Sequence, residues 1–159
     1  MKPILLVVTT LFILAACTGG RKSPHESVSS ENIKVTYGRP YKKGREIFGG
    51  LEKYGKVWRT GADEATEITF YKDGKFGGEP VKAGTYSLYT IPNENEWTII
   101  INKQTGQSGM TYNQSQDLLR IQVHPTKLDE SVEQLTIRLE EKNMTIEWDK
   151  TRVVIPIEF

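Results

Sequence analysis

The sequence predicts an all-β domain, either an antiparallel β-sandwich or a barrel-like fold, of about eight to ten short strands. Three observations support this fold class. Stretches in which apolar and polar residues alternate recur at a spacing of roughly ten residues along most of the chain. Turn signals rich in Gly, Pro, Asn and Asp separate these stretches. No stretch has the periodicity of an amphipathic helix long enough to cover a sheet.

Residues 1–16 are expected to be a bacterial lipoprotein signal peptide. Lys2 supplies the positive start, and residues 4–14 are almost wholly apolar. This run is too short to span a bilayer as a helix but suits the apolar region of a signal peptide. The sequence Leu-Ala-Ala-Cys at 14–17 resembles a lipobox, which implies cleavage before Cys17 and lipidation of its thiol. The alternative is an ordinary secretory signal followed by an incidental cysteine.

Cys17 is the only cysteine, so the chain has no disulfide framework and no thiol metal site. Acyl chains on Cys17 would hold the protein at a membrane, because each buried CH₂ contributes about 0.8 kcal/mol. We therefore expect a membrane-anchored lipoprotein of the bacterial cell envelope that faces the periplasm. The polar composition after Cys17 predicts a flexible tether over residues 17–32. A single all-β domain is expected over residues 33–159.

Charge is balanced overall but unevenly distributed. Removal of the signal peptide takes away Lys2 and leaves 20 basic residues against 20 acidic ones. Because domains that bind nucleic acid are usually basic, this balance argues against nucleic acid as a partner. Residues 37–62 nevertheless hold seven cations against two acids. The seven cations are Arg39, Lys42, Lys43, Arg45, Lys53, Lys56 and Arg59.

Individual strands follow from the alternation pattern. Residues 33–37 predict a half-buried strand, residues 57–60 a short strand that carries Trp58, and residues 66–72 a third strand. Asp73-Gly74 predicts a two-residue hairpin after this third strand. Further strands are expected at 79–82, 85–91, 96–102, 118–124, 132–140, 144–148 and 151–157. The polar segments between them, including 103–116 and 126–131, are expected to be irregular.

Residues 55–66 are the main candidate for a binding site, because a tryptophan, cations and carboxylates lie there between glycines. Trp58 offers a flat apolar face for a sugar ring, and Arg59 is a planar donor suited to carboxylates, phosphates or sugar hydroxyls. Glu64 offers a hydrogen-bond acceptor and, with Asp63, an acid/base pair. The alternative is structural: Trp58 belongs to the core, and Arg59 pairs internally with one of these carboxylates.

A basic run at 39–45 adds Arg39 and Arg45 to the candidate site. It offers positive charge to an anionic ligand or to lipid headgroups beside the anchor. A solvated loop is the structural alternative. The nearby glycines follow no phosphate-loop spacing. The predicted ligand-binding residues are therefore Arg39, Arg45, Trp58, Arg59 and Glu64.

His124 is the only histidine in the predicted domain and lies at a strand end before Pro125. Together with Glu64 it is a candidate for catalysis, although a structural role is the alternative. The chain has no G-x-S-x-G nucleophile motif, and one histidine without a cysteine makes no usual zinc set. We therefore expect no metal and no cofactor.

A series of longer motifs extends over residues 33–157. They are YGRPYKKGREIFGGL at 37–51, YGKVWRTGADEAT at 54–66, KAGTYSL at 82–88, Pro92 before Trp97, LDE at 128–130, Trp148 and TRV at 151–153. Together they resemble an uncharacterised bacterial envelope family, the domain of unknown function 2911. Asp63 departs from the family pattern, in which Asn is expected, and this implies a hydrogen-bonding role rather than proton transfer. The resemblance implies no activity.

Three functional hypotheses follow. The first is a lipid-anchored envelope protein that binds a small polar ligand, such as a saccharide or a cell-wall fragment, without catalysis. The second is a hydrolase that uses Glu64 with Asp63 or His124. The third is an envelope assembly or interaction module that meets a partner through a sheet edge or the basic loop. The first is preferred because the candidate residues include no nucleophile paired with a base.

Overall fold

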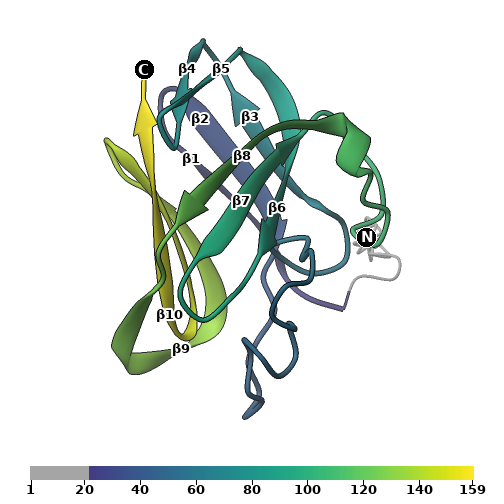
Figure 1. Ribbon diagram of the computed structural model, residues 1–159, viewed down its shortest axis with the longest axis vertical. Coiled ribbons are helices and arrows are strands. Elements are labelled where there is room, and N and C mark those ends of the chain that lie inside the picture. The colour runs from purple at the N-terminus through teal and green to yellow at the C-terminus, as the bar shows by residue number, and fades with distance from the viewer. Residues whose placement is uncertain (1–21) are drawn as a thin grey trace, which may run out of the picture.

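The computed structural model describes residues 22–159 (Figure 1). The predicted signal peptide and Cys17 lie outside these residues. The described chain forms ten strands and one short 3₁₀ helix. Their bounds are β1 (His25–Ser29), β2 (Ile33–Gly38), β3 (Thr66–Phe70), β4 (Gly74–Phe76), β5 (Glu79–Val81), β6 (Gly84–Ile91), β7 (Trp97–Asn102), η1 (Gln114–Gln116), β8 (Asp117–Val123), β9 (Thr126–Leu139) and β10 (Asn143–Glu158).

The strands form two antiparallel sheets, which confirms the prediction of an all-β sandwich and shows that the sheet does not close into a barrel. The larger sheet has the order β1-β2-β3-β6-β7-β8, and the smaller has the order β5-β4-β10-β9. In Figure 1 the long β9 and β10 stand at the left, beside the strands of the larger sheet. One cluster of buried apolar side chains from both sheets fills the space between them.

Alternation in the sequence explains which side chains enter this core. Along β2, Ile33 and Val35 are fully buried while Lys34 between them is more exposed. Val35 lies opposite Ile68 of β3, so neighbouring strands place apolar residues on the same face. The same period along β10 buries Val153, Ile155 and Ile157.

The predicted tether is wrong for residues 25–29, because these residues form β1. All five pair with β2 in antiparallel register. The hydroxyls of Ser27 and Thr36 lie 2.8 Å apart across this pair. Backbone hydrogen bonds along the edge of β2 compensate for the shortage of apolar side chains, and only Val28 packs on the core. The fold therefore begins before residue 33.

The predicted hairpin at Asp73-Gly74 is also wrong, because the chain changes sheets there. β3 pairs with β2 and β6, whereas β4 pairs with β5 and β10. The Asp73 carboxylate accepts hydrogen bonds from the Lys82 ammonium at 2.6 Å and the Ala83 N–H at 2.9 Å. These bonds hold the connection between the two sheets in place. Phe76, which follows it in β4, is fully buried in the core.

Two further boundaries differ from the prediction. Residues 57–60 form a single bridge rather than a strand: the Trp58 N–H donates to the Thr90 carbonyl at 2.7 Å, and the Thr90 N–H donates back at 2.9 Å. Residues 126–131, predicted to be irregular, belong to β9, which pairs with β10 across two irregularities in register. Polar side chains on an exposed sheet face hide a strand from alternation analysis.

An aromatic cluster, formed by Phe48, Trp58, Trp97 and Trp148, fills one end of the core. The rings of Trp58 and Trp148 stack with centroids 5.9 Å apart and an interplanar angle of 19°. Phe48 meets Trp97 edge-on at 4.7 Å. These geometries are favourable for aromatic pairs, so the cluster forms a rigid base for the segment that covers it.

Candidate functional site

The aromatic cluster is covered by residues 39–65, an irregular segment that extends below the two sheets in Figure 1. Backbone hydrogen bonds fasten it at several points. The Lys42 N–H donates to the Glu133 carbonyl at 2.7 Å, and the Gly55 N–H to the Pro92 carbonyl at 2.9 Å. Loops held on a rigid scaffold are the usual position of binding residues. Of the cavities beside this segment, two have the most extensive linings.

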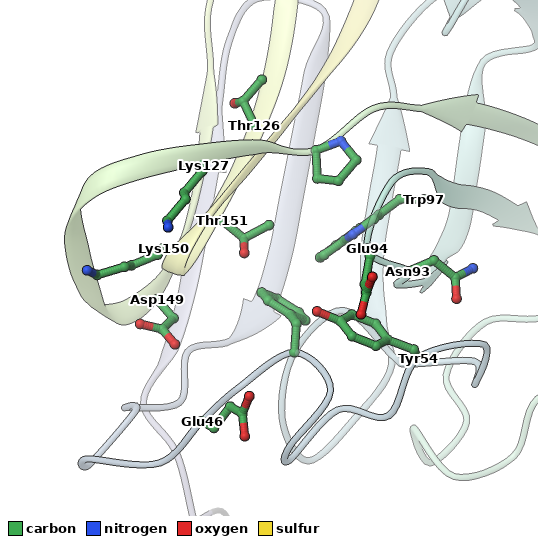
Figure 2. Close-up of a pocket in the computed structure, with 12 residues that line it drawn as sticks. Glu46, Tyr54, Asn93, Glu94, Trp97, Thr126, Lys127, Asp149, Lys150 and Thr151 are labelled. Atoms are coloured by element: carbon green, nitrogen blue, oxygen red, sulfur yellow. The ribbon is translucent and has the colours of Figure 1, made fainter.

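The first is the Tyr54 cavity, which has a volume of about 500 Å³ (Figure 2). It is built from the covering segment, the β6–β7 turn, and the adjoining parts of β7, β9 and β10. Its lining residues are Glu46, Phe48, Tyr54, Asn93, Glu94, Trp97, Pro125, Thr126, Lys127, Asp149, Lys150 and Thr151.

Tyr54 is the accessible aromatic ring of this cavity. Its side chain is 40% exposed, whereas Trp97 behind it is only 1% exposed. Burial raises the pKa of the Tyr54 phenol, and the negative charges of Glu94 and Glu46 raise it further. Two carboxylates therefore lie within electrostatic reach of the phenol, and the hydroxyl remains a hydrogen-bond donor at neutral pH.

The opposite wall of the Tyr54 cavity is basic. In Figure 2, Lys127 and Lys150 lie across the cavity from Tyr54 and Glu94. Asp149 lies beside these lysines and is held at 2.9 Å by the Lys42 ammonium and at 2.8 Å by the Ser131 hydroxyl. Burial raises the pKa of Asp149, but these hydrogen bonds and the Lys42 charge outweigh burial and hold it below its usual range. The cavity thus presents acceptors on one side and ammonium donors on the other.

The second is the Arg59 cavity, with a volume of about 330 Å³. Trp148 lines it, whereas Phe48 and Trp97 line the Tyr54 cavity, so the aromatic cluster separates the two. Its lining residues are Lys22, Ser23, Pro40, Tyr41, Lys43, Arg45, Leu51, Glu52, Arg59, Gly61, Ala62, Asp63 and Trp148.

The structure brings together two of the five predicted ligand-binding residues, Arg45 and Arg59, in the Arg59 cavity. Trp58 instead lies in the core, where it is 4% exposed and its indole N–H donates to the Gly61 carbonyl at 3.3 Å. It therefore offers no face to a ligand, and the structural alternative describes its position.

Arg39 lies outside both cavities and joins the two sheets. Its guanidinium donates to the Glu26 carboxylate at 2.7 Å, the Leu135 carbonyl at 2.9 Å and the Thr136 hydroxyl at 2.9 Å. Since these three acceptors come from β1 and β9, Arg39 fastens the first edge strand to the opposite sheet. A ligand would have to displace these bonds to reach it.

Glu64 lies in a third, smaller cavity of about 200 Å³, which it lines with His25, Ser87 and Gln107 among others. Its carboxylate is 2.9 Å from Nε2 of His25, a residue that the sequence placed in the tether. His124 is elsewhere, at the end of β8, with Nδ1 2.9 Å from the Asn95 carbonyl. The structure therefore does not bring Glu64 and His124 together.

Asp63 binds backbone rather than a catalytic partner. Its carboxylate accepts hydrogen bonds from the N–H groups of Lys22 at 3.3 Å and Ser23 at 3.2 Å. Its φ of 67° lies in the left-handed region, which Asn and Asp adopt more readily than most residues. Both features fit a role that Asn would also fill.

Sequence reasoning missed the Tyr54 cavity, because its lining residues come from four separate parts of the chain that each read as an ordinary turn or strand end. The available signal was the polar turn Asn93-Glu94-Asn95 beside a buried Trp97. Within residues 22–159 no group of three or more His, Cys, Asp or Glu residues is placed to hold a metal ion. Over the same residues no helix is long and apolar enough to cross a membrane.

A family model matches most of the chain. The family is described as "Protein of unknown function (DUF2911)", and its model matches residues 21–157. Neither a curated protein nor a solved structure matches the chain. The match begins just before β1 and ends within β10, so it includes both sheets and the residues of both cavities. It confirms the resemblance drawn from the sequence motifs, and the chain belongs to the DUF2911 family of proteins of unknown function.

Proposed function

We propose that this chain is a lipid-anchored protein of the bacterial envelope that binds a small polar, saccharide-type ligand in the Tyr54 cavity without catalysis. The observation that carries the proposal is the composition of this cavity. An accessible aromatic ring lies beside carboxylates and an amide, and two ammonium groups face them across about 500 Å³. Cavities of this size commonly hold small-molecule ligands.

The polar groups of the Tyr54 cavity have hydrogen-bonding capacity left for a ligand. Among the described residues, the side chains of Glu46, Glu94, Asn93 and Lys150 make no hydrogen bond or ion pair with each other or with other side chains. Sugar hydroxyls both donate and accept, so they match carboxylates on one wall and ammonium groups on the other. The exposed face of Tyr54 suits the apolar face of a sugar ring.

The positions of the catalytic candidates favour binding over hydrolysis. Glu64 faces His25, Asp63 accepts two backbone N–H groups, and His124 contacts a backbone carbonyl. Each side chain is thus engaged separately. A pair of acid and base groups has to reach the same substrate bond to act together, and these three line no common cavity.

Binding can be tested by NMR titration with two saccharides, maltose and the disaccharide of N-acetylglucosamine and N-acetylmuramic acid. Shifts are expected for the backbone amides of the β6–β7 turn and for the Trp97 indole. Tyr54→Ala should weaken binding about two- to tenfold, because loss of an aromatic stacking partner costs about 0.5–1.5 kcal/mol. Tyr71→Ala is the matched control, since Tyr71 is 54% exposed and lies outside both cavities. Equal loss in both variants, or no shift with either saccharide, would refute the proposal.

The anchor is tested separately. Cys17→Ser should release the protein from membranes, because the proposed acyl chains need the thiol as their attachment point. Membrane fractionation of cells that express each form measures this. Continued membrane association of the Ser variant would contradict lipidation.

A further inference from the structure

The Arg59 cavity differs from the Tyr54 cavity in charge. Four cations line it, namely Lys22, Lys43, Arg45 and Arg59. Two carboxylates, Glu52 and Asp63, face them, so the formal charge of the lining is +2. Among residues 22–159, no ion pair involves any of these four cations, and Asp63 accepts backbone N–H groups instead.

Arg59 is held in position while most of its donors are unused. Its Nε donates to the Gly61 carbonyl at 3.4 Å, and its terminal nitrogens bond to none of the described residues. Gly109 packs directly on its aliphatic stem: a Cβ added there would lie 2.1 Å from the Arg59 Cδ. A guanidinium whose stem is fixed loses less conformational entropy when it binds an anion.

Arg45 is oriented by neutral acceptors. It donates to the Lys42 carbonyl at 2.8 Å and to the Tyr41 carbonyl at 2.6 Å. These bonds fix the guanidinium without neutralising its charge. Glu52 lines the same cavity, and burial raises the pKa of its carboxyl, while the positive charges of Arg59 and Arg45 oppose that rise.

We propose that the Arg59 cavity is a second binding site and that it takes a phosphate monoester. A phosphate monoester carries about 1.5 to 2 negative charges at pH 7, which matches the +2 lining. The planar Arg59 guanidinium can hold two of its oxygens at once. Tyr41 and Leu51, which are 42% and 43% exposed, lie at the cavity and offer apolar contact to the organic part of the ligand.

The phosphate can belong to a soluble metabolite or to a lipid headgroup. The two sources share the monoester but differ in their apolar part. Glycerol 3-phosphate represents the soluble source, and dihexanoyl phosphatidic acid, used below its micelle concentration, represents the lipid source. Either ligand binding in the Arg59 cavity supports the proposal, and tighter binding of the second by tenfold or more assigns the lipid source.

The experiment is isothermal titration calorimetry of the purified full chain in detergent with both ligands. Arg59→Gln should weaken binding at least about tenfold, as expected when a charge-assisted hydrogen bond is lost. Lys56→Gln is the matched control, because it removes one positive charge from the same segment at an exposed side chain outside the cavity. Its affinity should remain within about twofold of the unchanged protein, since exposed charges are screened by salt.

Glu52→Gln provides a gain-of-function arm. It removes the carboxylate that competes for Arg59 and Arg45, so phosphate binding should become tighter severalfold. A purely structural role of Glu52 would instead weaken binding or leave it unchanged. If Arg59→Gln does not fold, as judged by its thermal transition, the affinities of Arg45→Gln and Glu52→Gln test the proposal instead. Arg45→Gln should weaken phosphate binding, and Glu52→Gln should strengthen it.

Two results would overturn the proposal. One is an equal loss of affinity in Lys56→Gln and Arg59→Gln, which would show that only general charge attraction is at work. The other is the absence of binding heat with both ligands at millimolar concentration. Neither result concerns the Tyr54 cavity, so the saccharide proposal is tested independently of this one.

Discussion

Replacement of Trp58 by alanine separates the two interpretations of this residue. If Trp58 is part of the core, as its 4% exposure indicates, Trp58→Ala should destabilise the fold strongly. Burial of a tryptophan removes about 150–250 Å² from water, which at about 25 cal/mol per Å² corresponds to about 4–6 kcal/mol. The stacking with Trp148 and the bond to Gly61 would be lost as well.

Partial relaxation of the cavity lowers this cost, and large aromatic-to-alanine changes in cores usually cost about 3–5 kcal/mol. For a domain of this size, each kcal/mol shifts the thermal midpoint by about 3 °C, so we expect a decrease of about 9–15 °C. Trp58→Phe should recover part of it, because Phe retains an aromatic contact with Phe48 and Trp97.

The assay is thermal unfolding followed by circular dichroism, with urea unfolding as a second measure of the free energy. Tyr71→Ala serves again as the exposed control and should shift the midpoint by less than about 2 °C. A Trp58→Ala protein with an unchanged midpoint and a weakened affinity for a ligand would refute the core assignment. It would restore the earlier interpretation of Trp58 as a binding surface.

Two further predictions concern stability. Glu147 is 3% exposed and forms ion pairs with two arginines; burial raises its pKa, but hydrogen bonds from these arginines outweigh burial and lower it overall. The pKa of Glu147 in the folded protein is below its unfolded value, so its contribution to stability is present above about pH 4.3 and is lost as pH falls further. The difference in unfolding midpoint between the unchanged protein and Glu147→Gln should therefore shrink from pH 6 to pH 3. A constant difference would contradict this. Gly77→Ala should lower the free energy of unfolding by about 2–4 kcal/mol, because the residue has φ 60° and an added Cβ would lie 1.9 Å from the Ile121 Cδ1. Gly78→Ala is the control: it has φ 87° and open space around an added Cβ, so it should cost only about 1 kcal/mol of backbone strain. Equal urea midpoints for the two alanine variants would be inconsistent with the close contact.

The fold class was predictable because alternation is a local property of the sequence. Val35, Ile68 and Leu88 each sit in an alternating stretch, and all three are buried. β1 was not predicted, because it is stabilised by backbone pairing with β2 and not by its own side chains. The change of sheet at Asp73-Gly74 was not predicted either, because the same two residues suit both a hairpin and a connection between sheets. The long-range pairing of β4 with β10 decides between the two.

The site was predictable only in part, for a similar reason. Arg45 and Arg59 were found from their local charge density, and they do line one cavity. The Tyr54 cavity depends on Glu94 and Lys127, which are distant in sequence and meet only when both sheets have formed. The prediction that Trp58 binds a ligand was wrong, because a tryptophan next to charged residues has the same local sequence whether its ring faces solvent or the core.

The aromatic cluster sets how variants of both cavities should be interpreted. It forms the wall between them, with Trp148 on one side and Trp97 on the other. A substitution at Trp58 that destabilises the fold therefore disturbs both cavities, and loss of binding in such a destabilised variant says nothing about ligand contact. Tyr54 and Arg59 each reach one cavity from outside the buried cluster. Only substitutions of this kind can show that the two ligands bind independently, because they change one binding surface and leave the shared wall in place.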